Sequence, residues 1–92
     1  MDIKFSKLEW EETGFINNED ILYFSGREVN NKILMFSILY QNNKYYCSGN
    51  AILIYYKDNQ CKFDTFEEAK DFCQQCYEKY CKELIDNLLK QF

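Results

Sequence analysis

The sequence lacks residues on which most small enzymes and metalloproteins rely. Its 92 residues include no histidine, no proline and three glycines, Gly14, Gly26 and Gly49. Without histidine, the most common general base, the Ser-His and Cys-His nucleophile pairs and the most common zinc ligand are absent. The scattered glycines form neither a P-loop nor a dinucleotide-binding fingerprint. The composition therefore predicts a non-enzymatic protein that holds no cofactor and no metal.

Arginine is also scarce, because Arg27 is the single arginine among 11 basic residues. Fifteen acids leave a net charge of −4. Phosphate contacts, many of them made by arginine, dominate affinity for duplex nucleic acid, so such a partner is disfavoured. An ordinary solvated acidic surface explains the early acids better than mimicry of a nucleic acid does. These acids are Glu9, Glu11, Glu12, Glu19 and Asp20.

The charges are segregated along the chain. Residues 1–31 carry three bases and seven acids (−4), residues 32–63 four bases and one acid (+3), and residues 64–92 four bases and seven acids (−3). Two acidic flanks thus enclose a mildly basic middle.

Targeting signals are missing from the sequence. Met1–Phe5 contains no apolar signal segment, and the longest apolar run, Ala51–Tyr56, is too short to span a bilayer. We therefore expect no membrane association and a location in the cytoplasm of the cell that makes the protein. An odd number of cysteines without a signal peptide predicts reduced thiols. The five are Cys47, Cys61, Cys73, Cys76 and Cys81.

The first two thirds of the chain read as an antiparallel β-meander, within a single domain over residues 1–92. Asn17-Asn18, Asn30-Asn31 and Asn42-Asn43 lie 13 and 12 residues apart. Asparagine tolerates positive φ, so the pairs predict hairpin turns. Branched and aromatic residues dominate the segments between them, as is typical of strands. The predicted strands, within about residues 3–63, are Ile21–Phe24, Ile33–Tyr40, Tyr45–Cys47 and Ala51–Tyr56, with a first one over about Phe5–Glu12.

From Thr65 the apolar period changes from two residues to 3.6. Thr65-Phe66-Glu67-Glu68 is a capping box, which predicts a helix from residue 65 to about residue 90. The predicted fold class is therefore α+β: an antiparallel meander of four or five strands with one long C-terminal helix packed on one face. The predicted apolar stripe of the helix consists of Phe66, Ala69, Cys73, Cys76, Tyr77, Tyr80, Leu84 and Leu88.

Both alternating faces of the predicted strands are apolar, although one helix covers only one face. The second face is therefore expected to meet a partner protein, a second copy of the chain or a ligand that stacks on aromatic rings. The plainer alternative is a tyrosine-rich exposed face that the N-terminal segment partly covers. The predicted partner-binding residues are Glu9, Trp10, Glu11, Glu12, Tyr23, Tyr40, Tyr45, Tyr55 and Tyr56.

The cysteines and the paired acids give weaker signals. Cys73 and Cys76 form a CxxC, but it lies inside the predicted helix, where no free amide lowers the thiol pKa. A zinc site would need two further cysteines, and core packing is favoured. Acidic pairs such as Glu67 and Asp71 mark no pocket that would separate their pKa values.

Residues 63–77, FDTFEEAKDFCQQCY, together with Leu8-Glu9-Trp10, resemble a recurrent pattern in small phage and prophage proteins of uncharacterised function. In that pattern a Trp-containing meander leads into F-x-T-x-E-E-A-K-x-x-C-Q and a closing helix. The long asparagine-rich and tyrosine-rich sheet and Cys76 depart from it. The resemblance implies a mobile-element protein, and proteins of that origin often block host defence, anti-CRISPR proteins among them, by covering a functional surface.

We therefore expect a phage-type protein that binds and blocks a host protein or defence complex, such as CRISPR-Cas, in the cytoplasm of a bacterial cell. Two alternatives remain open. One is a single-stranded nucleic-acid or nucleotide-binding module that uses the same aromatic residues, and it is less favoured because arginine is scarce. The other is a structural homodimer that buries the second sheet face.

Overall fold

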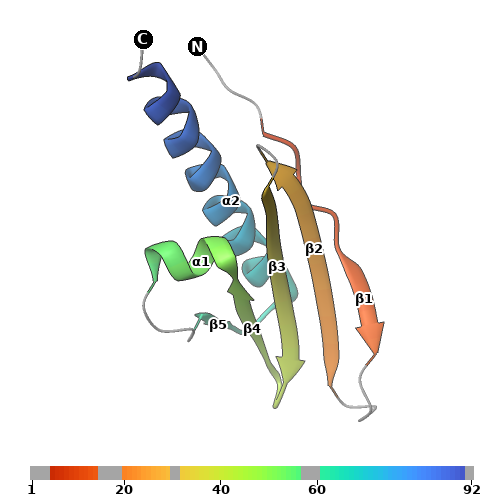
Figure 1. Ribbon diagram of the computed structural model, residues 1–92. Coiled ribbons are helices and arrows are strands. Elements are labelled where there is room, and N and C mark those ends of the chain that lie inside the picture. Colours follow the sequence, from red (N-terminus) through yellow and green to blue (C-terminus); the bar gives the residue numbers. More distant parts are fainter. Residues whose placement is uncertain (1–4, 15–19, 30–31, 57–60, 91–92) are drawn as a thin grey trace.

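The computed structural model describes residues 5–14, 20–29, 32–56 and 61–90 (Figure 1). Five strands form one antiparallel sheet in the order β1-β2-β3-β4-β5. The strands are β1 (Glu11–Gly14), β2 (Ile21–Val29), β3 (Lys32–Gln41), β4 (Lys44–Gly49) and β5 (Cys61–Phe63), and the helices are α1 (Asn50–Tyr55) and α2 (Phe66–Leu89). Each strand pairs with its neighbour in sequence, so the predicted meander and the α+β class are confirmed.

The turn between β3 and β4 follows from its sequence. Asn42 and Asn43 both have positive φ, 54° and 63°, and Gln41 pairs with Lys44 beside them. Two consecutive residues with positive φ give the turn whose twist suits a two-residue hairpin, and asparagine tolerates that conformation. The predicted turn is confirmed here, whereas Asn17-Asn18 and Asn30-Asn31 lie outside the described residues.

Helix α2 begins and ends close to the predicted bounds. The Thr65 hydroxyl accepts a hydrogen bond from the backbone amide of Glu68 at 3.1 Å, which caps the first turn. The 24 residues of α2 extend about 36 Å at 1.5 Å per residue, farther than the neighbouring strands. Its last turns reach past the sheet (Figure 1), and Leu88 and Leu89 there are 49% and 67% exposed.

The predicted last strand over Ala51–Tyr56 is wrong, because this segment forms helix α1 and its C-cap. Two neighbouring residues explain the change. At Gly49 the chain passes so close to β3 that a Cβ atom would lie 2.4 Å from the carbonyl oxygen of Met35. β4 ends there, opposite Phe36.

Asn50 then closes the edge of β3 in place of further strand residues. Its side-chain oxygen accepts from the amide of Met35 at 3.1 Å, and its side-chain nitrogen donates to the carbonyl of Ile33 at 2.9 Å. The same oxygen accepts from the amide of Ala51 at 2.9 Å, at the start of α1. Because the Asn50 side chain bonds these backbone groups of β3, the apolar run that follows need not pair with β3 as a strand. It forms a helix instead, and Ala51 and Ile52 are buried in the core.

The predicted first strand is shifted as well. β1 begins only at Glu11, and residues 5–10 have no regular structure. The backbone before β1 bonds to helix α2 instead: Leu8 donates to the side-chain oxygen of Gln74 at 2.9 Å, and the Gln74 nitrogen donates to the carbonyl of Ser6 at 3.0 Å. Leu8 is buried in the same core as α2. Residues 5–10 therefore pack on the helix side of the sheet.

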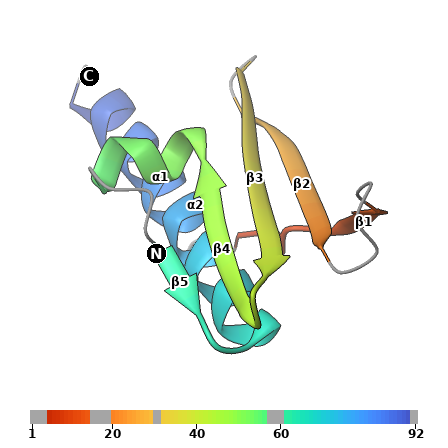
Figure 2. The ribbon, with the colours of Figure 1, turned by 90° about the horizontal axis from the view of Figure 1, so that it is seen from below.

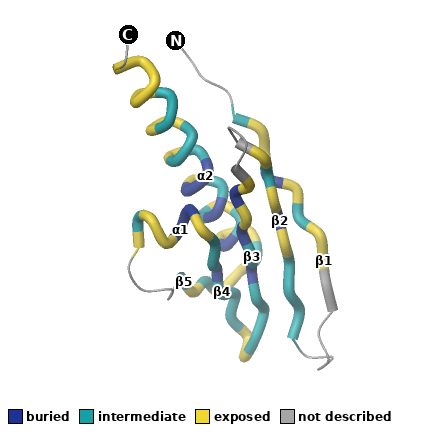
Figure 3. Tube along the Cα trace, viewed as in Figure 1, coloured by how far each residue is buried: buried dark blue, intermediate teal, exposed yellow. Residues whose placement is uncertain are grey.

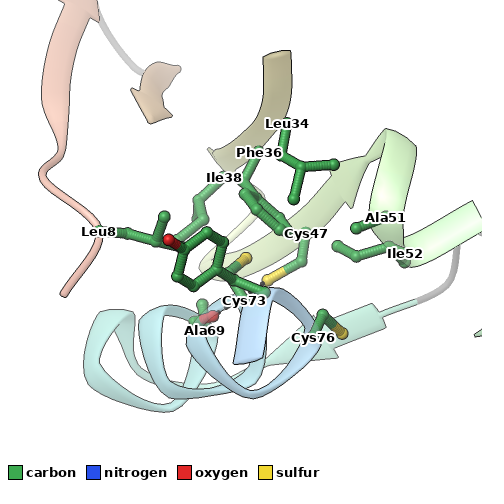
Figure 4. Close-up of a cluster of buried hydrophobic side chains, with 11 residues drawn as sticks. Leu8, Leu34, Phe36, Ile38, Cys47, Ala51, Ile52, Ala69, Cys73 and Cys76 are labelled. Carbon is green, nitrogen blue, oxygen red and sulfur yellow. Dashed lines mark hydrogen bonds between the residues drawn. The ribbon is translucent and has the colours of Figure 1, made fainter. Parts of the chain in front are cut away.

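Both helices lie on one side of the sheet (Figure 2). The core lies between the sheet and the helices (Figure 4). From β3 it contains three consecutive residues of one face, Leu34, Phe36 and Ile38, which pack with buried residues of β4 and the helices. All three are at most 3% exposed. The other contributors are Leu8, Cys47, Ala51, Ile52, Ala69, Cys73, Cys76 and Tyr77.

Candidate protein-binding surface

The side of the sheet opposite the helices, called the open face here, carries an apolar centre. Buried and exposed positions alternate along β3 (Figure 3): Ile33 precedes the core residue Leu34 and Met35 follows it, and they are 60% and 51% exposed. Phe24 of β2, which pairs with Ser37, is 38% exposed. The strand pairing places six apolar residues on this face, all exposed or half-buried: Leu22, Phe24, Ile33, Met35, Leu39 and Tyr46.

A shallow depression marks the open face where β4 ends. It holds about 250 Å³ and is lined by Phe24, Met35, Phe36, Ser37, Gly49 and Asn50. β4 ends at Gly49 and the chain turns into α1, so β3 has no strand beside it on that side from Met35 back to Lys32, although β2 still pairs with its other side. This break opens the hollow. Such a depression beside exposed Met35 and Phe24 has a lining that suits an apolar side chain.

Charged residues flank the apolar centre, with opposite signs at its two edges. Glu11 of β1 pairs with Phe24, and Glu28 of β2 pairs with Ile33, so both acids share the open face. At the other edge, the pairing places Lys44 of β4 and Lys62 of β5 on the same face. Lys44 forms an ion pair with Asp64, which lowers the pKa of that carboxyl through hydrogen bonding and attraction. Lys62 is exposed and carries the net positive charge of this edge.

Four of the predicted contact residues lie on the helix side of the sheet instead. Phe66, at the start of α2, stands at the centre of this group: its ring centroid lies 4.3 Å from Tyr23, 5.7 Å from Tyr45 and 6.5 Å from Trp10. Tyr40 in turn lies 4.6 Å from Tyr45. Burial, and then the nearby Glu12, raises the pKa of Tyr23. These rings extend the core to the sheet edge.

Two more predicted residues, Tyr55 and Tyr56, belong to α1 and its C-cap. The Tyr55 hydroxyl donates to Glu83 at 2.8 Å, and the Lys79 ammonium lies 4.3 Å from the Tyr55 ring centroid. Burial, followed by the bond to Glu83, raises the pKa of Tyr55 to about 12. Tyr56 is 43% exposed, with its ring 5.2 Å from Phe72 of α2. These contacts hold α1 against α2.

The three predicted acids are exposed but do not share one face. Glu11 lies on the open face, whereas Glu12 pairs with Tyr23 and lies on the helix side. Glu9 precedes β1 and is exposed. The nine predicted residues are therefore spread over both sides of the molecule. The sequence analysis did not name Phe24, Ile33 and Met35 as contact residues. The signal that could have identified them is the alternation along the strands, which places them on the face opposite Phe36.

Four cysteines lie near one another in and beside the core. Cys47 and Cys61 pair across β4 and β5, and the Cys47 thiol donates to the carbonyl of Ala69 at 3.5 Å. Hydrogen bonding with Cys47, and then burial, raises the pKa of the Cys73 thiol; burial raises that of Cys76 to about 11. The raised pKa values keep the Cys73 and Cys76 thiols protonated, which disfavours their reaction as thiolates. Among the described residues, no group of three or more His, Cys, Asp or Glu side chains is arranged to hold a metal ion.

No helix among the described residues is both long enough and apolar enough to cross a membrane.

No protein family, curated protein or solved structure matches this chain. The likeness of residues 63–77 to phage and prophage proteins therefore stays a prediction from the sequence.

Proposed function

We propose that this protein is a non-enzymatic binding protein that lays the open face on another protein and blocks it. The observation that carries the proposal is the exposure of Ile33, Met35 and Phe24 on the face that no helix covers. Scattered exposed apolar residues are normal, but several on one sheet face, beside a hollow, are typical of an interface. Methionine and phenylalanine are also enriched at interface cores.

The resemblance to phage proteins supports the choice of partner. A mobile-element protein that blocks by covering a surface would bind a host protein, and we propose a component of a bacterial defence system such as CRISPR-Cas, in the cytoplasm of the host. A binding role also agrees with Cys73 and Cys76, whose raised pKa values disfavour thiolate chemistry.

The open face fits a protein better than a single-stranded nucleic acid. Base stacking needs several exposed rings in a positively charged groove. Among the described residues, the aromatic side chains of the open face are Phe24 and Tyr46, and two acids, Glu11 and Glu28, lie at its edge. The rings of Tyr23, Tyr45 and Tyr56 pack instead against Phe66 and Phe72 of α2.

A matched pair of variants tests the proposal. Ile33 and Ile54 are 60% and 59% exposed, the first on the open face and the second on α1. The tagged protein would first capture its partner from a lysate of the bacterial host, and affinities would then be measured with the purified partner. Ile33→Lys should weaken binding roughly tenfold or more, the usual loss for a central interface residue.

Ile54→Lys is the control for Ile33→Lys. Ile54→Lys makes the same chemical change at the same exposure and should bind like the unchanged protein. Equal affinity of the two variants, or a loss confined to Ile54→Lys, would remove the open face as the binding surface.

A further inference from the structure

The open face is electrostatically self-complementary. Its acidic edge, Glu11 and Glu28, lies on β1 and β2. Its basic edge lies on β4 and β5, where Lys62 carries the net positive charge and Lys44 is paired with Asp64. β3, in the middle of the sheet, carries the apolar centre with Ile33 and Met35. A surface that is apolar in the middle and oppositely charged at its two edges can pair with a copy of itself.

We infer that the open face pairs with the open face of a second copy about a two-fold axis that runs along β3. Such an axis stacks β3 on β3, so that the apolar centres of both copies are buried together. It also reverses the strand order, so that β1 of one copy lies over β5 of the other. Glu11, which is level with Ser37 of β3, then lies over the same edge as the partner's Lys62, which is level with Leu39. The two residues are two positions apart along the strands, about 7 Å, a gap that long glutamate and lysine side chains span, and symmetry repeats this contact on the opposite edge.

The alternative two-fold axis, across the strands, is disfavoured by the same charges. It would place β1 over β1 and β5 over β5, so that acids would meet acids and lysines would meet lysines. Like charges brought together at an interface cost binding energy and exclude that arrangement. Packed sheets keep their strands within about 30° of parallel, which the axis along β3 permits.

This inference rests on the proposed function, because it assigns the same face. It adds a regulation: the homodimer is the resting form of the protein, and a blocked partner must displace the second copy to reach Ile33 and Met35. Affinity for the partner should therefore fall as the concentration of the protein rises into the range of the homodimer.

Charge reversal with mixing tests the homodimer. Glu11→Lys and Lys62→Glu would each be made in the full chain, and their masses measured by light scattering and sedimentation over a range of concentrations. Each variant alone places like charges at both symmetric contacts, so its dimer should dissociate roughly tenfold more readily, in low salt, than that of the unchanged protein. Mixed in equal amounts, the two variants should form a heterodimer as stable as the original, because each contact again joins a lysine to a glutamate.

The mixture also guards against misfolding, because damaged proteins would not regain association when combined. Circular dichroism of each variant checks the fold directly. The inference would be overturned by an unchanged protein that stays monomeric at every concentration, by variants that dimerise as well as it does, or by folded variants that stay monomeric when mixed. Monomeric behaviour with partner binding still lost in Ile33→Lys would refute the homodimer and leave the proposed function standing. A confirmed homodimer together with partner binding that Ile33→Lys does not weaken would support the homodimer and refute the proposed function.

Discussion

Adding one methyl group at Gly49 should lower the melting temperature sharply, because the backbone of β3 already occupies that space. The new Cβ atom of Gly49→Ala would lie 2.4 Å from the carbonyl oxygen of Met35 and 3.2 Å from two carbon atoms of Phe36. Ordinary contacts begin near 3.4 Å, so one strand must move by about 1 Å. Phe36 is 1% exposed, so a shift of β3 at this point would disturb the packed core.

The cost follows from this geometry. Forcing an extra carbon into a well-packed site typically costs about 1 to 3 kcal/mol, and a clash with backbone belongs at the upper end, about 2 to 3 kcal/mol. At roughly 4 to 8 °C per kcal/mol for a domain of this size, the melting temperature should fall by roughly 10 to 20 °C. Thermal and urea unfolding, followed by circular dichroism, measure both quantities.

Gly26→Ala is the matched control. A Cβ atom at Gly26 meets only the side chains of Ile33 and Met35, at 3.9 and 4.0 Å, and Gly26 does not adopt the left-handed φ that disfavours alanine. Alanine there should leave stability unchanged or raise it by roughly 0.4 to 1 kcal/mol, because it restricts the unfolded chain. If Gly49→Ala proved as stable as Gly26→Ala, the close approach of β4 to β3, and with it our explanation of why the strand ends there, would be wrong.

Three further predictions concern single side chains. Asn50→Ala should cost about 1 to 2 kcal/mol and speed hydrogen exchange at the Met35 amide, with Asn50→Asp intermediate because it keeps the acceptor; equal exchange rates in all three proteins would contradict the bridging role. Thr65→Ala should lower the free energy of unfolding in urea by about 1 kcal/mol, whereas Thr65→Ser keeps the capping hydroxyl and should lose little. The Tyr55 pKa of about 12 lies above the unfolded value of 10.0, so its contribution to stability is full below pH 10 and is lost as the pH rises towards 12. Tyr55→Phe should remove that part of the alkaline loss and the late step of an ultraviolet titration, and an unchanged titration would refute the assignment.

The elements that local chemistry determines were predictable from the sequence. The turn at Asn42-Asn43 and the start of α2 at Thr65 each depend on a few adjacent residues whose backbone preferences agree with the fold. The apolar run from Ala51 was not predictable in this way. Its β-branched and aromatic residues favour a strand, but the choice depended on Gly49 and Asn50 meeting β3, a contact between distant parts of the chain.

Of the candidate surface, the sequence predicted only that the strands have more apolar residues than one covered face can bury. The sequence indicated that both faces of the central strand are apolar, but not which face the helices would take. That choice placed Tyr23 and Tyr45 beside Phe66 of α2, and left Ile33 and Met35 exposed. Tyrosine suits an exposed face because its hydroxyl tolerates water, but the same amphipathic ring also suits the rim of a core.

The meander turns the order of charges in the sequence into an arrangement in space. Residues 1–31 carry −4 and residues 32–63 carry +3, and each strand lies beside the next one in the chain. The acids of the open face, Glu11 and Glu28, therefore reach one edge and Lys62 the other. A sheet of the same strands in another order, with β1 beside β5, would bring Glu11 and Lys62 together within one copy, where they would neutralise one another. The self-complementary face thus depends jointly on the charge order in the sequence and on the topology, and neither alone produces it.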